Sequence, residues 1–452
     1  MSVSPGEYLD QSNWAVNFDI VCYIMEFLPK HTLLPFMSTC RALRTAGVRH
    51  LLSLPVRFDS QTDILSFCVF LHRDLAIRPQ HIRDIFLDLS WLQDPLAPVL
   101  HSLLEALLHA RTLHTLGLVV RNDSLMRFPE ITTTLASIRS IQGLTLVTDP
   151  GEGERGLLSR MCPLAKLALT YVQSPSNCSP LLETHSNTLT ELSLRNGILS
   201  ERLIQFPSLQ RLRISYEHRF LDKNILVSTF PNLTDLELVP ASSIRAPTHS
   251  QLFEWRTQNS VGTASDWLHL ASVRGSFTDI YVLGLSCTLE RLEIVIDISR
   301  IRPMVLHPHA TLGESSTLIG IIPEVFRDAP DTLMELDIHL TPDATRVNPA
   351  EDYVELCFVC LENNRFSRLR RLHLNFRKPT LQESSWLYIH VPAQTQTFYD
   401  QIDAYDLARR TAARVTTLRK LDLRLDGSSM ISWTIPCTNG IPTPYLTKWE
   451  DL

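Results

Sequence analysis

The stretches LTELSL (189–194), LQRLRI (209–214) and LTDLEL (233–238) repeat one pattern, apolar-x-x-apolar-x-apolar, at short and similar intervals. The last two apolar positions lie two residues apart and therefore face the same side of a β-strand. The first apolar position turns inward where the strand begins. One such unit is too small to bury its own leucines, so neighbouring units must stack.

Eight more copies extend the pattern along the chain: IRDIFL from Ile82, LHTLGL from Leu113, IQGLTL from Ile141, LAKLAL from Leu164, LERLEI from Leu289, LMELDI from Leu333, LRRLHL from Leu369 and LRKLDL from Leu418. A single copy means little, but eleven in order are typical of the strand segment of leucine-rich repeats. We predict an α/β solenoid, an irregular leucine-rich-repeat horseshoe, over residues 57–435. Irregular insertions are expected near 240–288 and 379–402, and a C-terminal tail over 436–452.

The sequence before the repeats is of another kind, NFDIVCYIMEFLPKHTLLPFMSTCRALR (17–44). Its apolar spacing predicts three short helices after a flexible start at 1–13. Pro29 ends the first helix, Thr32 begins the second, and the third runs from Arg41 to Leu52. Three helices of this length cannot bury so much apolar surface by themselves, so the repeats or a partner must cover part of it.

Residues 14–56 resemble an F-box. The resemblance rests on Phe18-Asp19-Ile20, Ile24, Leu28, Leu33-Leu34 and Cys40-Arg41-Ala42-Leu43, while Val16-Asn17 stands where the family has Leu-Pro. An F-box followed by leucine-rich repeats implies the substrate-recognition subunit of a cullin–RING (SCF-type) ubiquitin ligase. The F-box would dock on a Skp-type adaptor, and through it on a cullin, while the repeats hold a protein substrate. The residues that this resemblance places at the adaptor are Phe18, Ile20, Ile24, Phe27, Leu28, Leu33 and Leu34.

The alternative is a non-catalytic leucine-rich-repeat scaffold for protein interactions. Its N-terminal helices would only cap the solenoid, because repeat arrays need their first core shielded.

The outward positions of the strands form a second candidate surface, with charges that alternate in blocks. The candidate substrate-binding residues are Arg195, Arg211, Arg213, Asp235, Glu237, Arg371, His373, Lys420 and Arg424. The arginines could bind an acidic or phosphorylated segment of a substrate. Equally, the charges could compensate one another across the strands on a solvated face.

Composition argues against several classes of partner. The chain is 44% hydrophobic and 20% charged with a net charge of −6, which gives no general reason to expect nucleic acid or a membrane surface. No apolar run approaches the length of a membrane span, and the start has no signal-peptide pattern. Nine scattered cysteines suggest free thiols in a reducing compartment, so we expect a cytoplasmic or nuclear location.

Catalytic signals are weak, so we expect neither an enzyme nor a bound cofactor or metal. GEGERG (151–156) matches a dinucleotide-binding motif, but Glu152 and Glu154 would repel a pyrophosphate, and a flexible acidic loop is the better interpretation. The C-x-x-C pair Cys357 and Cys360 lacks a second pair at zinc spacing. His307 and His309 flank a proline and are interpreted as a loop.

Overall fold

The computed structural model describes residues 18–450, except 59, 91, 93–95, 122–123, 173–175, 200–203, 217–220, 241–246, 262–265, 298–320, 342–360, 362–365, 377–402, 426–429, 439–440 and 443. The chain divides into two compact units, residues 1–168 and 169–452, and each is described by itself. The proposed motif start at Val16-Asn17, the expected insertion at 379–402, and the pairs Cys357/Cys360 and His307/His309 lie outside the described residues.

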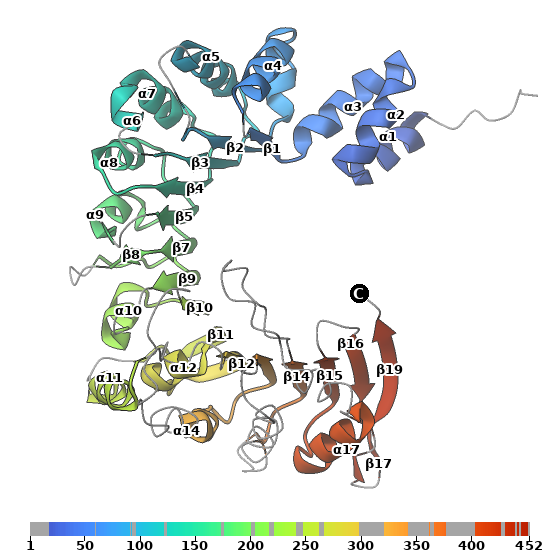
Figure 1. Ribbon diagram of the computed structural model, residues 1–452, viewed down its shortest axis with the longest axis vertical. Helices are drawn as coiled ribbons and strands as arrows, with labels where there is room; N and C mark the ends of the chain where they lie inside the picture. The colour runs from blue at the N-terminus through green and yellow to red at the C-terminus, as the bar shows by residue number, and fades with distance from the viewer. Residues whose placement is uncertain are drawn as a thin grey trace, which may run out of the picture. The chain divides into compact units, whose positions relative to one another are not determined.

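The helices alternate with the strands along most of the chain (Figure 1). The helices are α1 (Phe18–Phe27), α2 (Lys30–Ser38), α3 (Arg41–Ser53), α4 (Gln61–His72), η1 (Arg78–His81), α5 (Ala97–Leu108), α6 (Ser124–Arg127), α7 (Pro129–Ser137), α8 (Glu152–Leu158), α9 (Ser179–Leu182), η3 (Glu183–His185), α10 (Lys223–Thr229), α11 (His249–Val261), α12 (Phe277–Leu283), α14 (Ile321–Asp328) and α17 (Ala404–Arg414). The strands are β1 (Val56–Phe58), β2 (Asp84–Asp88), β3 (Thr115–Val119), β4 (Gly143–Thr148), β5 (Lys166–Tyr171), β6 (Ser176–Asn177), β7 (Glu191–Arg195), β8 (Gly197–Ile198), β9 (Arg211–Tyr216), β10 (Asp235–Pro240), β11 (His269–Ser276), β12 (Thr288–Asp297), β13 (Glu335–Thr341), β14 (Arg371–Phe376), β15 (Lys420–Leu425), β16 (Met430–Thr434), β17 (Cys437–Thr438), β18 (Ile441–Pro442) and β19 (Tyr445–Glu450).

One long sheet contains most of the strands, in the order β1-β2-β3-β4-β5-β7-β9-β10-β11-β12-β13-β14-β15-β16-β19. The registered pairs are parallel from β1 to β4 and from β7 to β15, and antiparallel at β15–β16–β19. The prediction of an α/β fold is therefore confirmed, and its sheet is long and mostly parallel. Residues 445–450, expected in a tail, form β19 instead.

The leucine pattern explains why these segments are strands. In the copy at 189–194, Leu189, Leu192 and Leu194 are each at most 2% exposed, and the residues between them are not fully buried. The same alternation recurs in the other copies and leaves one apolar face on each strand. Helices lie over that apolar face, and α12 contacts both β11 and β12.

Small polar side chains join each copy of the leucine pattern to the copy before it. The residue just before the first apolar residue of a copy is often Ser, Thr or Asn. Its side chain donates a hydrogen bond to a backbone carbonyl that lies 21 to 48 residues earlier in the chain. These bonds run from Thr112 to Ile82, Ser140 to Ala110, Ser208 to Asn187, Asn232 to Pro207 and Thr417 to Leu369. The side chains satisfy backbone groups at the corner where each strand begins.

The expected insertion at 240–288 contains a strand of the sheet. β11 pairs in parallel with β10 and β12, and α11 and α12 flank it in sequence. Its pattern is Leu270-x-x-Val273-x-Gly275, in which glycine replaces the last leucine. A Cβ atom at Gly275 would lie 3.4 Å from Leu238, 3.6 Å from Asp279 and 3.7 Å from Ile280, which are ordinary van der Waals distances, so a methyl group would fit at this position.

The N-terminal helices α1–α3 pack around Met25, Leu33 and Met37. Their bounds agree with the three predicted helices, although the second begins at Lys30 rather than Thr32. Gly47 allows α3 to approach the other two, because a Cβ atom there would lie 2.3 Å from Met37. The bundle thus has a small core of its own, and α3 also contacts η1.

Candidate protein-interaction surfaces

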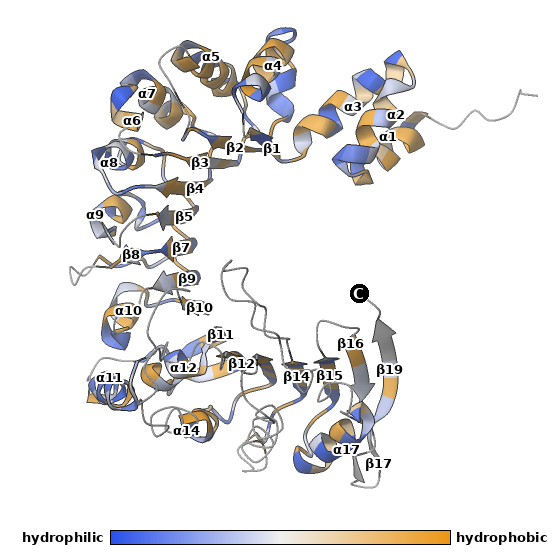
Figure 2. Cartoon of the chain, in the orientation of Figure 1, coloured by the Kyte–Doolittle hydropathy of each residue, from blue (hydrophilic) through white to orange (hydrophobic). Residues whose placement is uncertain are grey.

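Helix α1 is apolar on two sides. Met25 is 1% exposed and faces the bundle core with Val21. The opposite side carries Ile20, Tyr23, Ile24 and Phe27, which are spaced i, i+3, i+4 and i+7 and so form one stripe. We call this stripe the outer face of α1, and Figure 2 shows most of the helix coloured as hydrophobic.

The outer face is open to solvent. Ile20 is 53% exposed, Ile24 46% and Phe27 68%. Tyr23, which the sequence analysis did not select, is 63% exposed, and its ring packs edge-on against Phe27 with centroids 5.0 Å apart. Four exposed apolar side chains in one stripe make the outer face of α1 a candidate surface for protein interaction.

The other predicted adaptor residues divide between surface and core. Phe18 on α1 and Leu34 on α2 are 47% and 44% exposed and extend the apolar surface. Leu28 is half-buried against the bundle core. Leu33 is 0% exposed, so it holds the bundle together and does not lie on its surface with the others.

The outward residues of β7–β15, which we call the strand face, form rows across the second unit. The parallel pairing aligns a first row of Glu191, Arg211, Asp235, Ser272, Arg291, Glu335, Arg371 and Lys420. It aligns a second row of Ser193, Arg213, Glu237, Arg274, Glu293, Asp337, His373 and Asp422. Residues of neighbouring strands therefore lie side by side along each row.

Most of the predicted cations on this face are bound to carboxylates of the same chain. Arg211 lies 3.2 Å from Glu191 and 3.9 Å from Asp235, and Arg213 lies 3.5 Å from Glu237. Arg371 and Lys420 both reach Asp422, at 3.4 and 2.9 Å. These contacts favour the interpretation of charges that compensate one another. Arg195, at the end of β7, is exposed, and Arg424 is half-buried on β15.

The buried charged and amide side chains of the strand face, Asp337, Asn375 and Asp422, lie on β13, β14 and β15. Asp337 is 5% exposed and accepts two hydrogen bonds from Arg291, at 2.6 and 2.9 Å. Burial acts to raise the pKa of Asp337, but hydrogen bonds from His373 and Arg291 outweigh it and hold that pKa below its usual value. Burial likewise opposes ionisation of Glu293, whose pKa is lowered overall by the hydrogen bond from His339 and the charge of Arg274.

The segment GEGERG is not the flexible acidic loop that its composition suggested. Residues 152–158 form α8, and the carboxylate of Glu154 accepts the backbone N–H of Gly151 at 2.7 Å. Glu154 is 4% exposed, and burial raises its pKa despite the hydrogen bonds from backbone N–H groups. The side chain of Glu154 thus caps the start of α8, and we interpret the match of GEGERG to the dinucleotide-binding motif as a chance match.

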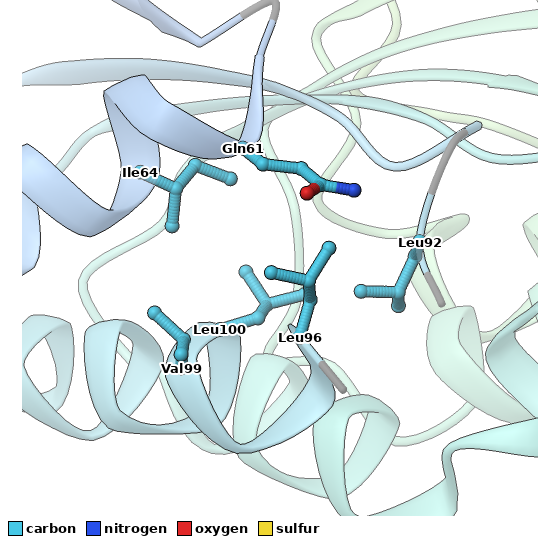
Figure 3. A pocket seen from close by; sticks show the side chains of 6 residues that line it. All are labelled: Gln61, Ile64, Leu92, Leu96, Val99 and Leu100. Carbon is cyan, nitrogen blue, oxygen red and sulfur yellow. The ribbon is translucent and has the colours of Figure 1, made fainter. Parts of the chain in front are cut away.

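A small pocket between α4 and α5 also carries no ligand site. Its walls are Gln61, Ile64, Leu92, Leu96, Val99 and Leu100 (Figure 3). The cavity of about 10 Å³ has room for roughly one water molecule. A lining of five apolar side chains and one amide offers little to bind.

Among the residues that the structure describes, no group of three or more His, Cys, Asp and Glu side chains is placed to hold a metal ion. Within the same residues, no helix is both long and apolar enough to cross a lipid bilayer. The two surfaces described above are therefore the strongest candidates for function. Neither the known protein-family models nor the curated proteins include a match to this chain.

Proposed function

We propose that this protein is the substrate-recognition subunit of a cullin–RING (SCF-type) ubiquitin ligase. In this proposal α1–α3 are an F-box that docks on a Skp-type adaptor, and through it on a cullin, in the cytoplasm or nucleus. The long sheet and its helices are an irregular leucine-rich-repeat horseshoe that binds a protein substrate. In this proposal the catalytic groups of the ligase belong to other subunits.

The exposed outer face of α1 is the observation that carries this proposal. If the three helices only capped the repeats, their apolar side chains would be expected to pack against the first repeat. Instead Ile20, Tyr23, Ile24 and Phe27 are 46–68% exposed, while α3 makes the contact with η1. A bundle with a core of its own and a second apolar face is suited to bind a partner helix or groove.

The test is binding of a purified Skp-type adaptor to the full chain. Ile24→Asp and Phe27→Asp each place a charge in the centre of the outer face, and we expect each to weaken adaptor binding about a hundredfold. Leu65→Asp on α4 is the matched control, because Leu65 is 41% exposed but lies outside the bundle. Circular dichroism should show all three variants folded, since each side chain is exposed.

Two outcomes would count against the proposal. A wild-type chain that does not bind the adaptor would leave the scaffold, with α1–α3 as a cap, as the better function. Equal weakening by Leu65→Asp would show that the effect is not specific to the outer face.

A further inference from the structure

Positive charge collects at one edge of the sheet in the first unit, the edge where the strands β2, β3, β4 and β5 begin (Figure 1). Backbone hydrogen bonds link this edge from strand to strand, since His114 N donates to Arg83 O at 2.8 Å and Gln142 N donates to His114 O at 2.9 Å. Arg111 and Arg139 occupy the same position in successive copies of the leucine pattern, two residues before the first apolar residue. The edge therefore carries a line of arginines, which we call the basic rim: Arg83, Arg111, Arg139 and Arg160.

The basic rim is not balanced by carboxylates of the same chain. All four arginines are exposed, and none of them forms an ion pair through its side chain with another residue that the structure describes. The stretches 78–84, 109–115, 138–143 and 159–166 together carry five arginines and one lysine but a single acidic residue, Asp84. The rim thus differs from the strand face, where Arg211 and Arg213 are paired with carboxylates.

Helix ends explain the position of these arginines but not what their side chains bind. Arg111, Arg139 and Arg160 follow α5, α7 and α8, and a cation near the C-terminus of a helix stabilises that helix. This effect of charge uses none of the N–H donors of the guanidinium groups. The donors therefore stay open to an anion from outside the chain.

The length and the surroundings of the basic rim favour an acidic peptide segment as that anion. Neighbouring strands lie about 4.8 Å apart, so the rim from β2 to β5 is about 15 Å long, which matches about five residues of extended chain. Each guanidinium group can bind a carboxylate through two parallel hydrogen bonds. Single-stranded nucleic acid is usually bound on aromatic side chains, whereas the exposed large apolar residues described between 78 and 168 are Leu108 and Met126.

We propose that the basic rim binds an acidic segment of a protein, one rich in aspartate or glutamate. That this protein is a ubiquitination substrate rests on the function proposed above, whereas the charge of the rim does not. The inference moves the expected contact with an acidic segment away from the arginines of the strand face, most of which the chain itself pairs. It assigns that contact to arginines that the sequence analysis did not select.

The test uses the full chain and a fluorescein-labelled nine-residue peptide of alternating glutamate and glycine, followed by fluorescence anisotropy. A second peptide carries glutamine in place of glutamate, which keeps the shape of the side chain without its charge. We expect the glutamate peptide to bind at least tenfold more tightly than the glutamine peptide. The double variant Arg111→Glu/Arg139→Glu should weaken binding of the glutamate peptide at least tenfold, because two attractive contacts become repulsive.

Two more double variants show whether the effect belongs to the rim. Arg211→Glu/Arg213→Glu is the matched control, because it makes the same change of charge at side chains of the strand face that are 65% and 57% exposed. It should leave the affinity for the glutamate peptide within about twofold of the wild type. Arg111→Lys/Arg139→Lys keeps the charge of the rim and should stay within about threefold.

Equal affinity of the wild-type chain for the glutamate and glutamine peptides would overturn the inference, and this comparison needs no variant to fold. Equal weakening by the rim and strand-face double variants would overturn it too. A short oligothymidylate with the same number of negative charges should bind more weakly than the glutamate peptide. Tighter binding would assign a nucleic acid to the rim in place of a protein.

Adaptor binding by the same preparations separates this inference from the function proposed above. The rim variants should bind the Skp-type adaptor as the wild type does, because the outer face of α1 is unchanged in them. A chain that binds the glutamate peptide but no adaptor keeps the rim as a binding surface and loses the ligase function. A chain that binds the adaptor but not the glutamate peptide loses only this inference.

Discussion

The outer face of α1 and the strand face of β7–β15 differ in how far the chain itself provides contacts for their side chains. On α1, Phe27 is 68% exposed and packs edge-on against the ring of Tyr23, which is also exposed. On the strand face, Arg211 and Arg213 both have carboxylates within 4 Å. Apolar surface without a cover gains free energy when a partner buries it, whereas paired charges must first give up their present contacts. Affinity for a partner should therefore depend mostly on the outer face of α1.

Two adjacent leucines on α2 give the sharpest test of this comparison. Leu33 is 0% exposed and Leu34 is 44% exposed. Leu33→Ala removes core packing and should destabilise α1–α3 by about 2–5 kcal/mol. Leu34→Ala should change stability by no more than about 0.5 kcal/mol, yet weaken adaptor binding. Hydrogen exchange of residues 18–53 measures the first effect, and equal loss of protection in both variants would contradict the assignment of core and surface.

Removal of the buried carboxylate at Asp337 should have the next largest effect. Asp337→Ala leaves Arg291 and His373 without their acceptor and should cost about 1–3 kcal/mol at pH 7, since Arg291 is half exposed and regains water. Because the folded pKa of Asp337 lies below its usual value, its contribution is complete above about pH 4 and is lost as the pH falls through the folded pKa.

Urea denaturation at pH 7 and at pH 3 measures this dependence. The difference in unfolding free energy between wild type and Asp337→Ala should narrow at the lower pH. A difference that stays constant or grows would mean that the ion pair is not its source.

Arg211 should contribute least. Its side chain is 65% exposed and its partners are Glu191 and Asp235, so Arg211→Ala should cost only about 0.2–1 kcal/mol. Salt screens exposed pairs more than buried ones, so the cost should disappear in about 1 M salt while most of that of Asp337→Ala remains. Urea denaturation at low and high salt compares the two, and an equal response would remove the distinction between exposed and buried rows.

The strands were predictable because their evidence is local. Two leucines at spacing two, after a third at spacing three, specify a strand and its buried side within six residues. β11 was missed because Val273 and Gly275 take the leucine positions; a search that allowed valine and glycine there would have found it.

The candidate sites were less predictable because each depends on what lies opposite. The sequence placed Leu33 with Ile24 and Phe27 at the adaptor, but the bundle buries Leu33 and leaves the other two exposed. A helix with apolar residues on two sides, such as α1, does not show from its sequence alone which side is covered. On the strand face the residue types were evident, but which carboxylate each cation contacts depends on the register of neighbouring strands.

The small polar side chains before each first leucine have a consequence for how such a chain can change. The side chains of Thr112, Ser208 and Thr417 each bond to a backbone carbonyl of the preceding copy of the leucine pattern, at separations from 21 to 48 residues. The alignment of neighbouring strands therefore does not depend on the length of the chain that connects them. Residues inserted between a helix and the next strand should leave the alignment intact, so new loops can be grafted onto this frame without redesign of its core.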